Sequence, residues 1–190
     1  MIQPDDKLKF VHLEYLARFG TPNGYFSFKS EIKDDTVPPE IVVFYWSDFG
    51  EDKSTLFCTL GMCSIKMEDD NSSELFFTVK RKLDADDIMA FCRFFADMAL
   101  YPFIHEFALD WWNLIIGVGR VPLYKDSGAV LVQPDFFNEK FCDIEMGDEI
   151  IKFFNIVPLT EEESDMVQKE GVVKLLDYIE ENKIDVFEIR

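Results

Sequence analysis

The chain has 190 residues, of which 48% are hydrophobic, so it can bury a substantial core and is most simply one domain over residues 1–190. It carries 37 Asp and Glu residues against 19 Lys and Arg residues, which gives a formal net charge of -18. A surface of that sign repels phosphate backbones and anionic lipid headgroups, so neither nucleic acid nor a membrane is expected as a partner.

The N-terminal segment MIQPDDKLKF has neither the basic nor the apolar region of a secretory signal, so a cytoplasmic location is expected. Charged residues interrupt the most apolar region, 90–119, which leaves no run of the ~20 apolar residues that a membrane helix needs. In the cytoplasm the cysteines are expected to be reduced thiols packed as small hydrophobes. They are Cys58, Cys63, Cys92 and Cys142.

The first predicted element is a helix over about residues 4–19. Pro4 suits a first helical turn, and Gly20 is a natural stop. The apolar residues that recur at helical spacing, and that are expected to face the core, are Leu8, Val11, Tyr15, Leu16 and Phe19.

Four segments rich in β-branched and aromatic residues follow, and they predict a meander of antiparallel strands. These segments are YFSFKSEIK (25–33), IVVFYWS (41–47), STLFCTL (54–60) and SELFFTVK (73–80). Asp84 then precedes a long apolar-periodic segment, which predicts a core-facing helix that ends before Pro102.

The C-terminal third is predicted to add strands and a last helical region. The strands are LIIGV (114–118), AVLVQ (129–133), IIKFFNIV (150–157) and a short final strand, IDVFEI (184–189). The helical region runs from Thr160 to about Asn182, and Thr160 with Glu163 has the spacing of a capping box. Strands in a block with helices at the ends favour an α+β fold.

No motif in the sequence indicates catalysis, a metal or a cofactor. His105-Glu106 begins like a zinc-protease motif, but its second histidine would fall at Leu109. GVGRVP has Pro122 where the dinucleotide fingerprint requires its third glycine, so it is interpreted as a turn. The spacing of the cysteines does not fit a zinc site. We therefore expect no catalytic, metal-binding or cofactor-binding residues.

Over residues 40–182 the sequence resembles the suppressor-of-fused domain family. The pieces that carry the resemblance are FCTLGMCSIKM (57–67) with its Leu60-Gly61-Met62 stretch and Met67, ELFFTV (74–79), ALYPF (99–103), and IIKFFNIVPLTEEE (150–163) before a helix with Gly171 and Leu175-Leu176. The resemblance implies an α+β fold with a central, mostly antiparallel or mixed sheet flanked by helices. It also implies a role in binding other proteins.

In animals the family member restrains a transcription factor in hedgehog signalling, and bacterial members of about this length are regarded as immunity proteins that neutralise a cognate polymorphic toxin. This chain looks like the bacterial kind. An acidic protein suits a basic partner such as a nuclease toxin, because opposite charge speeds encounter and buried rings supply affinity. The oligomeric state is left open.

The densest aromatic stretch, 101–112, is the candidate partner-binding segment. Its candidate residues are Tyr101, Phe103, His105, Asp110, Trp111 and Trp112. Core packing of these rings is the structural alternative. A hydrolase that uses His105 with neighbouring acids is the functional alternative.

Overall fold

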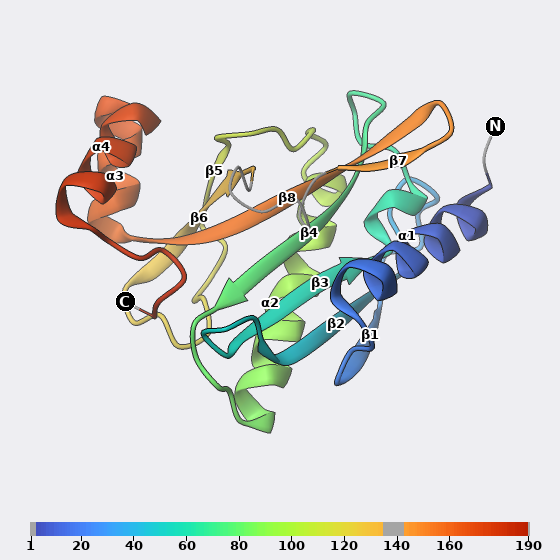
Figure 1. Cartoon of the computed structure of the whole chain (residues 1–190). Coiled ribbons are helices and arrows are strands. Elements are labelled where there is room, and N and C mark those ends of the chain that lie inside the picture. The colour runs from blue at the N-terminus through green and yellow to red at the C-terminus, as the bar shows by residue number, and fades with distance from the viewer. Residues whose placement is uncertain (1–2, 135–142, 190) are drawn as a thin grey trace.

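In the computed structural model, which describes residues 3–134 and 143–189, eight strands form one mixed sheet (Figure 1). The strands are β1 (Gly24–Lys29), β2 (Glu40–Phe49), β3 (Ser54–Leu60), β4 (Ser72–Val79), β5 (Leu114–Ile116), β6 (Ser127–Gln133), β7 (Ile144–Met146) and β8 (Glu149–Thr160). The helices are α1 (Pro4–Phe19), α2 (Ala85–Ile104), α3 (Glu161–Glu170) and α4 (Val172–Asn182), with a 3-10 turn, η1 (Met62–Ser64). The fold is α+β, as predicted.

The strand order is β1-β2-β3-β4-β8-β6-β5, and β7 pairs with β8 outside this path. The predicted antiparallel meander, β1 to β4, is confirmed. At the centre of the sheet β8 runs parallel to β4, where Ser72 lies opposite Ile151, and antiparallel to β6. The two outermost strands, β1 and β5, therefore come from distant parts of the chain.

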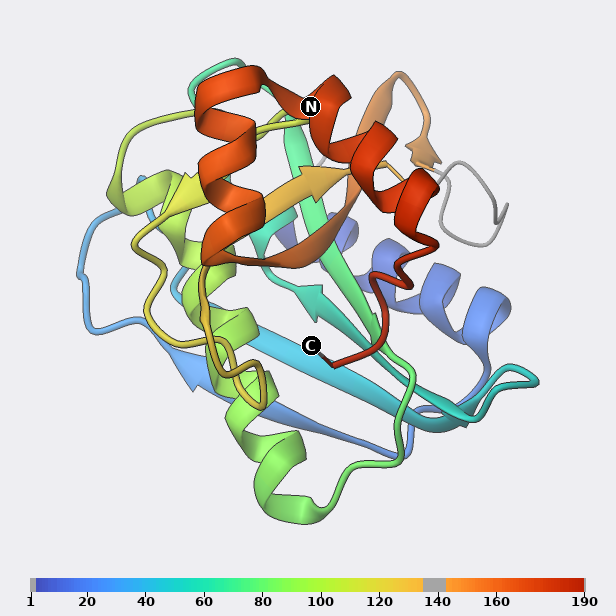
Figure 2. The ribbon, with the colours of Figure 1, turned by 90° about the vertical axis from the view of Figure 1, so that its left-hand side faces the viewer.

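One face of the sheet is covered by α2, and its core is built mainly from aromatic rings (Figure 2). Phe91 of α2 lies 5.4 Å from Phe57 of β3 and 5.7 Å from Phe77 of β4, measured between ring centroids. Phe95, one helical turn later, lies 5.7 Å from Phe77. Spacings of this size are those at which aromatic pairs attract each other. The predicted core-facing helix is confirmed, and Asp84 caps it by accepting a hydrogen bond from Asp87 N–H.

The opposite face is covered by α1 at one end and by α3 and α4 at the other (Figure 2). Val11 and Tyr15 of α1 are fully buried, but Leu16 is 36% exposed and does not face the core as expected. The buried side of α1 instead includes Lys7, whose Nζ lies 2.5 Å from Glu149 Oε2 and 3.4 Å from Ser72 Oγ. An apolar pattern thus marked the correct helix but included one residue too many.

The predicted helical region 160–182 consists of two helices that meet at Gly171, whose φ of 88° favours glycine. The capping box at its start is confirmed: Glu163 N–H donates to Thr160 Oγ1 at 3.3 Å, and Thr160 N–H donates to Glu163 Oε2 at 2.8 Å. The box directs the chain out of the sheet at the end of β8.

Among the predictions that the structure contradicts are the end of the first strand, which stops at Lys29 instead of residue 33, the end of the long helix, and the last strand. Helix α2 includes Pro102 and continues to Ile104, because the buried Pro102 and Phe103 pack against the core and this packing outweighs one lost helical hydrogen bond. Residues 184–189 form a turn instead of a strand. There Asp185 accepts a hydrogen bond from Phe187 N–H with its side chain, a local bond that competes with strand pairing.

A buried carboxylate organises the corner between β3, η1 and β4. Glu74 accepts hydrogen bonds from Thr59 Oγ1 at 2.6 Å, Gly61 N–H at 2.8 Å and Cys63 N–H at 3.1 Å. Burial raises the pKa of Glu74, and these hydrogen bonds oppose that rise. Gly61 has a φ of 140°, and a Cβ there would lie 2.4 Å from the carbonyl oxygen of Glu40, so only glycine fits.

Three of the cysteines lie in the core with free thiols, whereas Cys142 is outside the described residues. Burial raises the pKa of the Cys58 and Cys63 thiols well above the ordinary value and that of Cys92 to about 12. Such thiols stay protonated at neutral pH and are poor nucleophiles.

Candidate functional site

The candidate segment begins in the last turn of α2, where three aromatic side chains meet. The rings of Tyr101 and His105 lie 4.1 Å apart, and Phe107 packs edge-on against Tyr101 at 5.8 Å. The helix ends here because Glu106 takes a left-handed φ of 51°, after His105 N–H has donated to the Tyr101 carbonyl at 3.1 Å. The three rings are thus fixed by a helix end and are held at the surface.

These rings form one wall of a cavity of about 440 Å³ against the edge strand β5. The opposite wall is the strand itself with the residue before it, from Asn113 to Ile116. Ile116 is 54% exposed although it belongs to a strand of the sheet. We call Tyr101, His105, Phe107 and Ile116 the α2–β5 ledge. It combines an apolar surface with an outermost strand.

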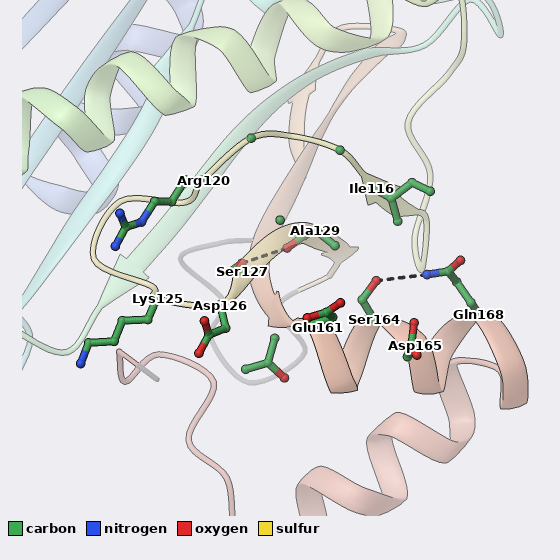
Figure 3. Close-up of a pocket in the computed structure, with 14 residues that line it drawn as sticks. Ile116, Arg120, Lys125, Asp126, Ser127, Ala129, Glu161, Ser164, Asp165 and Gln168 are labelled. Carbon is green, nitrogen blue, oxygen red and sulfur yellow. Dashed lines mark hydrogen bonds between the residues drawn. The ribbon is translucent and has the colours of Figure 1, made fainter.

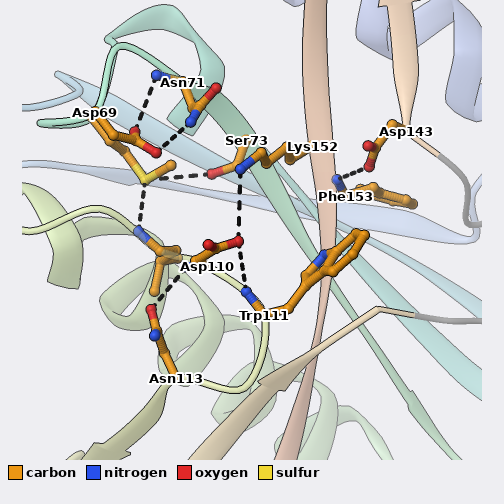
Figure 4. A network of polar contacts seen from close by, with 11 residues as sticks. Asp69, Asn71, Ser73, Asp110, Trp111, Asn113, Asp143, Lys152 and Phe153 are labelled. Carbon is orange, nitrogen blue, oxygen red and sulfur yellow. Dashed lines mark hydrogen bonds and ion pairs between the residues drawn. The ribbon is translucent and has the colours of Figure 1, made fainter.

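The link between α2 and β5 is a turn closed by its own polar groups (Figure 4). Asp110 N–H donates to Asn113 Oδ1 at 2.8 Å, and Asp110 Oδ1 accepts from Trp111 N–H at 2.9 Å. Lys152 Nζ of β8 lies 3.7 Å from Asp110 Oδ1. The turn is therefore tied to β8 by a partly exposed ion pair.

A thioether anchors the start of the same turn from below. Met67 Sδ lies 3.4 Å from the donating Leu109 N–H and 3.7 Å from the hydroxyl of Ser73. Both Met67 and Leu109 are buried. Met67 belongs to the stretch that carries the family resemblance, so that stretch helps to position the aromatic segment.

The structure separates the six predicted partner-binding residues. Tyr101 and His105 line the cavity together, Asp110 is exposed in the turn, and Trp111 is 46% exposed. Phe103, a residue of α2, is buried in the core between this helix and the sheet.

Trp112 is half-buried and packs against the cluster that α3 and α4 form on the sheet. Its φ is 68°, and its N–H donates to the Val132 carbonyl at 2.6 Å. Trp112 therefore secures the turn, and the outward tryptophan is Trp111.

Sequence reasoning missed Ile116, which was assigned only to a strand. Ile116 is exposed because β5 is the outermost strand of the sheet. That position is set by the pairing of β5 with β6. No local signal in LIIGV distinguishes an edge strand from a central one.

His105 has no ion pair with a carboxylate among the residues that the structure describes, and its ring contact is with Tyr101. A general base needs a partner within hydrogen-bond reach that orients it. The geometry therefore gives the hydrolase alternative no support. Within the described ranges, no group of three or more His, Cys, Asp or Glu side chains is placed to hold a metal ion.

A larger groove of about 720 Å³ lies beside the ledge and shares Ile116 with it (Figure 3). Arg120 and Lys125 stand on the loop before β6, and Glu161 and Asp165 stand on α3. The groove carries both charge signs. No described helix is both long and apolar enough to cross a bilayer.

Comparison with known proteins gives a consistent result. The family model described as Suppressor of fused protein (SUFU) matches residues 35–190. A structure described as a SUFU homolog from Neisseria gonorrhoeae FA 1090 has a TM-score of 0.71 at 15% identity and covers 98% of this chain and 95% of its own. No curated protein matches the sequence.

Two further structures share the fold at 10% identity and a TM-score of 0.60. One is described as the Sufu-Fu complex, with 96% of this chain and 84% of that chain covered. The other is Drosophila Suppressor of Fused, with 95% of this chain covered but only 46% of that chain. The present chain thus spans less than half of the Drosophila chain.

Proposed function

The chain belongs to the suppressor of fused family, a family of protein-binding regulators, and from this premise we propose that it is a non-catalytic immunity protein that neutralises a cognate polymorphic toxin in the cytoplasm. It acts as one domain, and the α2–β5 ledge is its partner-binding surface. The related structure described as the Sufu-Fu complex supports a protein as the partner.

The observation that carries the proposal is the ledge itself. An aromatic cavity of about 440 Å³ adjoins an outermost strand whose Ile116 is 54% exposed. Aromatic side chains in desolvated pockets supply most of the affinity of protein interfaces, and an edge strand offers backbone donors and acceptors. The ledge therefore suits an apolar anchor of a partner protein.

Charge indicates the nature of the partner. The net charge of -18 creates a negative field that attracts a basic protein and speeds its association. Glu106 and Asp110, both exposed, stand close to the ledge in the chain and add to the field there. A basic nuclease domain is a toxin of this kind.

The first experiment identifies the partner and tests neutralisation. The tagged chain is used to capture proteins from native lysate, and each captured protein is expressed alone and together with this chain. The proposal expects a basic protein that arrests growth alone and is harmless in the presence of this chain. Growth arrest that the chain does not relieve contradicts the immunity role.

The second experiment tests the surface with a matched pair of variants. Ile116→Asp places a carboxylate on the ledge, whereas Ile150→Asp does the same at a side chain of nearly equal exposure, 56%, beside β7. We expect Ile116→Asp to weaken binding of the captured toxin by at least about 2 kcal/mol and Ile150→Asp to leave it within about 0.5 kcal/mol.

Association rates measured at several salt concentrations distinguish the contribution of charge to binding from that of the apolar contact. The association rate should fall as salt rises, because screening shortens the field to about 8 Å at physiological ionic strength, and the affinity should fall less steeply. A salt-independent association rate, or equal effects of the two variants, would contradict this assignment of the surface.

A further inference from the structure

The other outermost strand, β1, lies at the opposite end of the sheet from the α2–β5 ledge, and no strand among the described residues pairs with its outer edge. Its residues face β2 in the register Tyr25 to Phe44, Ser27 to Val42 and Lys29 to Glu40. Ser30 N–H donates to the Pro39 carbonyl at 2.9 Å, which continues this ladder. Since an antiparallel ladder alternates, the backbone groups of Tyr25, Ser27 and Lys29 point away from β2.

The edge of β1 carries one exposed aromatic side chain, and the helix α1 carries two exposed leucines. Tyr25 is 63% exposed, and on the neighbouring helix α1 Leu13 is 54% and Leu16 is 36% exposed. Tyr25 and His12 of α1 both contact the ring of Phe44, at 5.8 Å and 5.0 Å, so the helix and the strand edge adjoin. We call Leu13, Leu16 and Tyr25 the β1-edge patch.

The sequence of β1 is complementary to itself in one antiparallel register. A two-fold axis through Ser27 pairs each Ser27 with its own copy and sets Tyr25 of one chain opposite Lys29 of the other, twice. An ammonium group beside a tyrosine ring is an attractive cross-strand pair. The same axis brings both copies of the β1-edge patch to one interface, as an isologous contact requires.

We propose that two copies of this chain associate through β1 in this register and form one continuous sheet. The interface is a single strand pair with its flanking patch, so the dimer is weak and depends on protein concentration. Both copies carry a charge of -18, and their repulsion is screened by salt. The dimer therefore strengthens as salt rises, whereas toxin binding at the ledge responds in the opposite direction.

Sedimentation equilibrium of the intact chain tests the association. The mass should rise with concentration from 22.2 kDa toward twice that value, and more readily at high salt. Ser27→Pro removes the outward N–H at the two-fold axis without removing a bond to β2, and should raise the dissociation constant at least about tenfold. Ser27→Ala is its control, because it removes the hydroxyl that bonds to Glu40 but keeps the backbone donor.

A second pair of variants tests the patch. Tyr25→Lys sets two ammonium groups opposite each other at both ends of the strand pair and should weaken the dimer at least about tenfold, and Ile150→Lys, on β8, should leave it unchanged. Melting curves confirm that each variant is folded. A chain that stays monomeric up to about 1 mM, or a dimer that Tyr25→Lys and Ser27→Pro leave intact, overturns the proposal.

Disulfide trapping tests the register even where Ser27→Pro fails to fold. Ser27→Cys should give a covalent dimer on oxidation, because the axis sets position 27 against itself. Lys29→Cys should not, since the two substituted positions would lie about 13 Å apart along the strands. The unsubstituted chain controls for its own cysteines. Equal trapping at both positions, or none at position 27, overturns the register.

Discussion

The chain reverses direction beside β4 in two regions, the corner around Glu74 and the turn around Asp110. The two regions are stabilised by different interactions. At the corner a fully buried carboxylate accepts three hydrogen bonds, and Gly61 is required by close packing. At the turn the polar groups are exposed, and the rings before it stand at the surface. The first region stabilises the fold, and the second is the region that we propose presents side chains to a partner.

The residues that carry the family resemblance lie mainly in the first of these two regions. The stretch from Leu60 to Met67, together with Glu74, makes the resemblance specific, and most of these residues are buried. One of them, Met67, reaches the second region through Leu109 N–H, so the recognisable part of the sequence supports the proposed surface from beneath.

The largest expected effect is the loss of the Glu74 carboxylate. Glu74→Ala leaves Gly61 N–H, Cys63 N–H and the Thr59 hydroxyl without their acceptor in a buried site, and should cost about 3 to 5 kcal/mol of unfolding free energy. Chemical denaturation measures this cost. The exposed Glu180→Ala is the control and should stay within about 0.5 kcal/mol. Equal denaturation midpoints for the two variants would show that the buried Glu74 carboxylate contributes no more to stability than an exposed glutamate.

The two adjacent tryptophans of the turn around Asp110 are expected to contribute differently to the stability of the fold. Trp112→Ala should cost about 2 to 4 kcal/mol of stability, because its side chain packs against the cluster under α3 and α4. Trp111→Ala, at 46% exposure, should cost less than about 1 kcal/mol. Thermal melting of both variants makes the comparison, and the reverse order would place the outward ring at Trp112.

The smallest expected effect is a pH dependence of the unfolding free energy that comes from Glu74. The folded pKa of Glu74 is raised above the ordinary 4.5, so the folded state binds the proton more tightly than the unfolded state. This contribution is fully present below about pH 4.5 and is lost as pH rises through the raised pKa.

Glu74→Gln cannot titrate, so its stability relative to the unsubstituted chain should improve as pH rises through that window. Denaturation at a series of pH values provides the measurement. A difference that stays constant from acid to neutral pH would show that Glu74 does not titrate as its burial requires.

Local signals predicted the parts of the fold that local contacts determine. Asp84 as a helix cap, the Thr160 and Glu163 capping box and the meander from β1 to β4 all depend on neighbours in sequence. The pairing of β4 with β8 was not predictable in this way, because Ser72 and Ile151 are distant in the chain. The order of strands in the sheet follows from that pairing.

The candidate site shows the same limit at the scale of single residues. The dense aromatic segment was visible in the sequence, but Tyr101 and Phe103, two positions apart, point to the surface cavity and to the core. Only the end of α2 and its packing decide between them. Ile116 joins the site because β5 is outermost, a property of the complete sheet.

The central position of β8 also fixes the order in which the chain can become stable. During synthesis β4 and β6 are complete before β8 leaves the ribosome, and each then exposes a row of unpaired backbone groups and apolar side chains on the side that β8 later fills. Closing this gap joins segments far apart in sequence, which makes it a slow step compared with formation of the meander. The nascent chain therefore has its greatest tendency to aggregate in the interval before β8 is inserted, and a chaperone that covers the β4 edge would act at that moment.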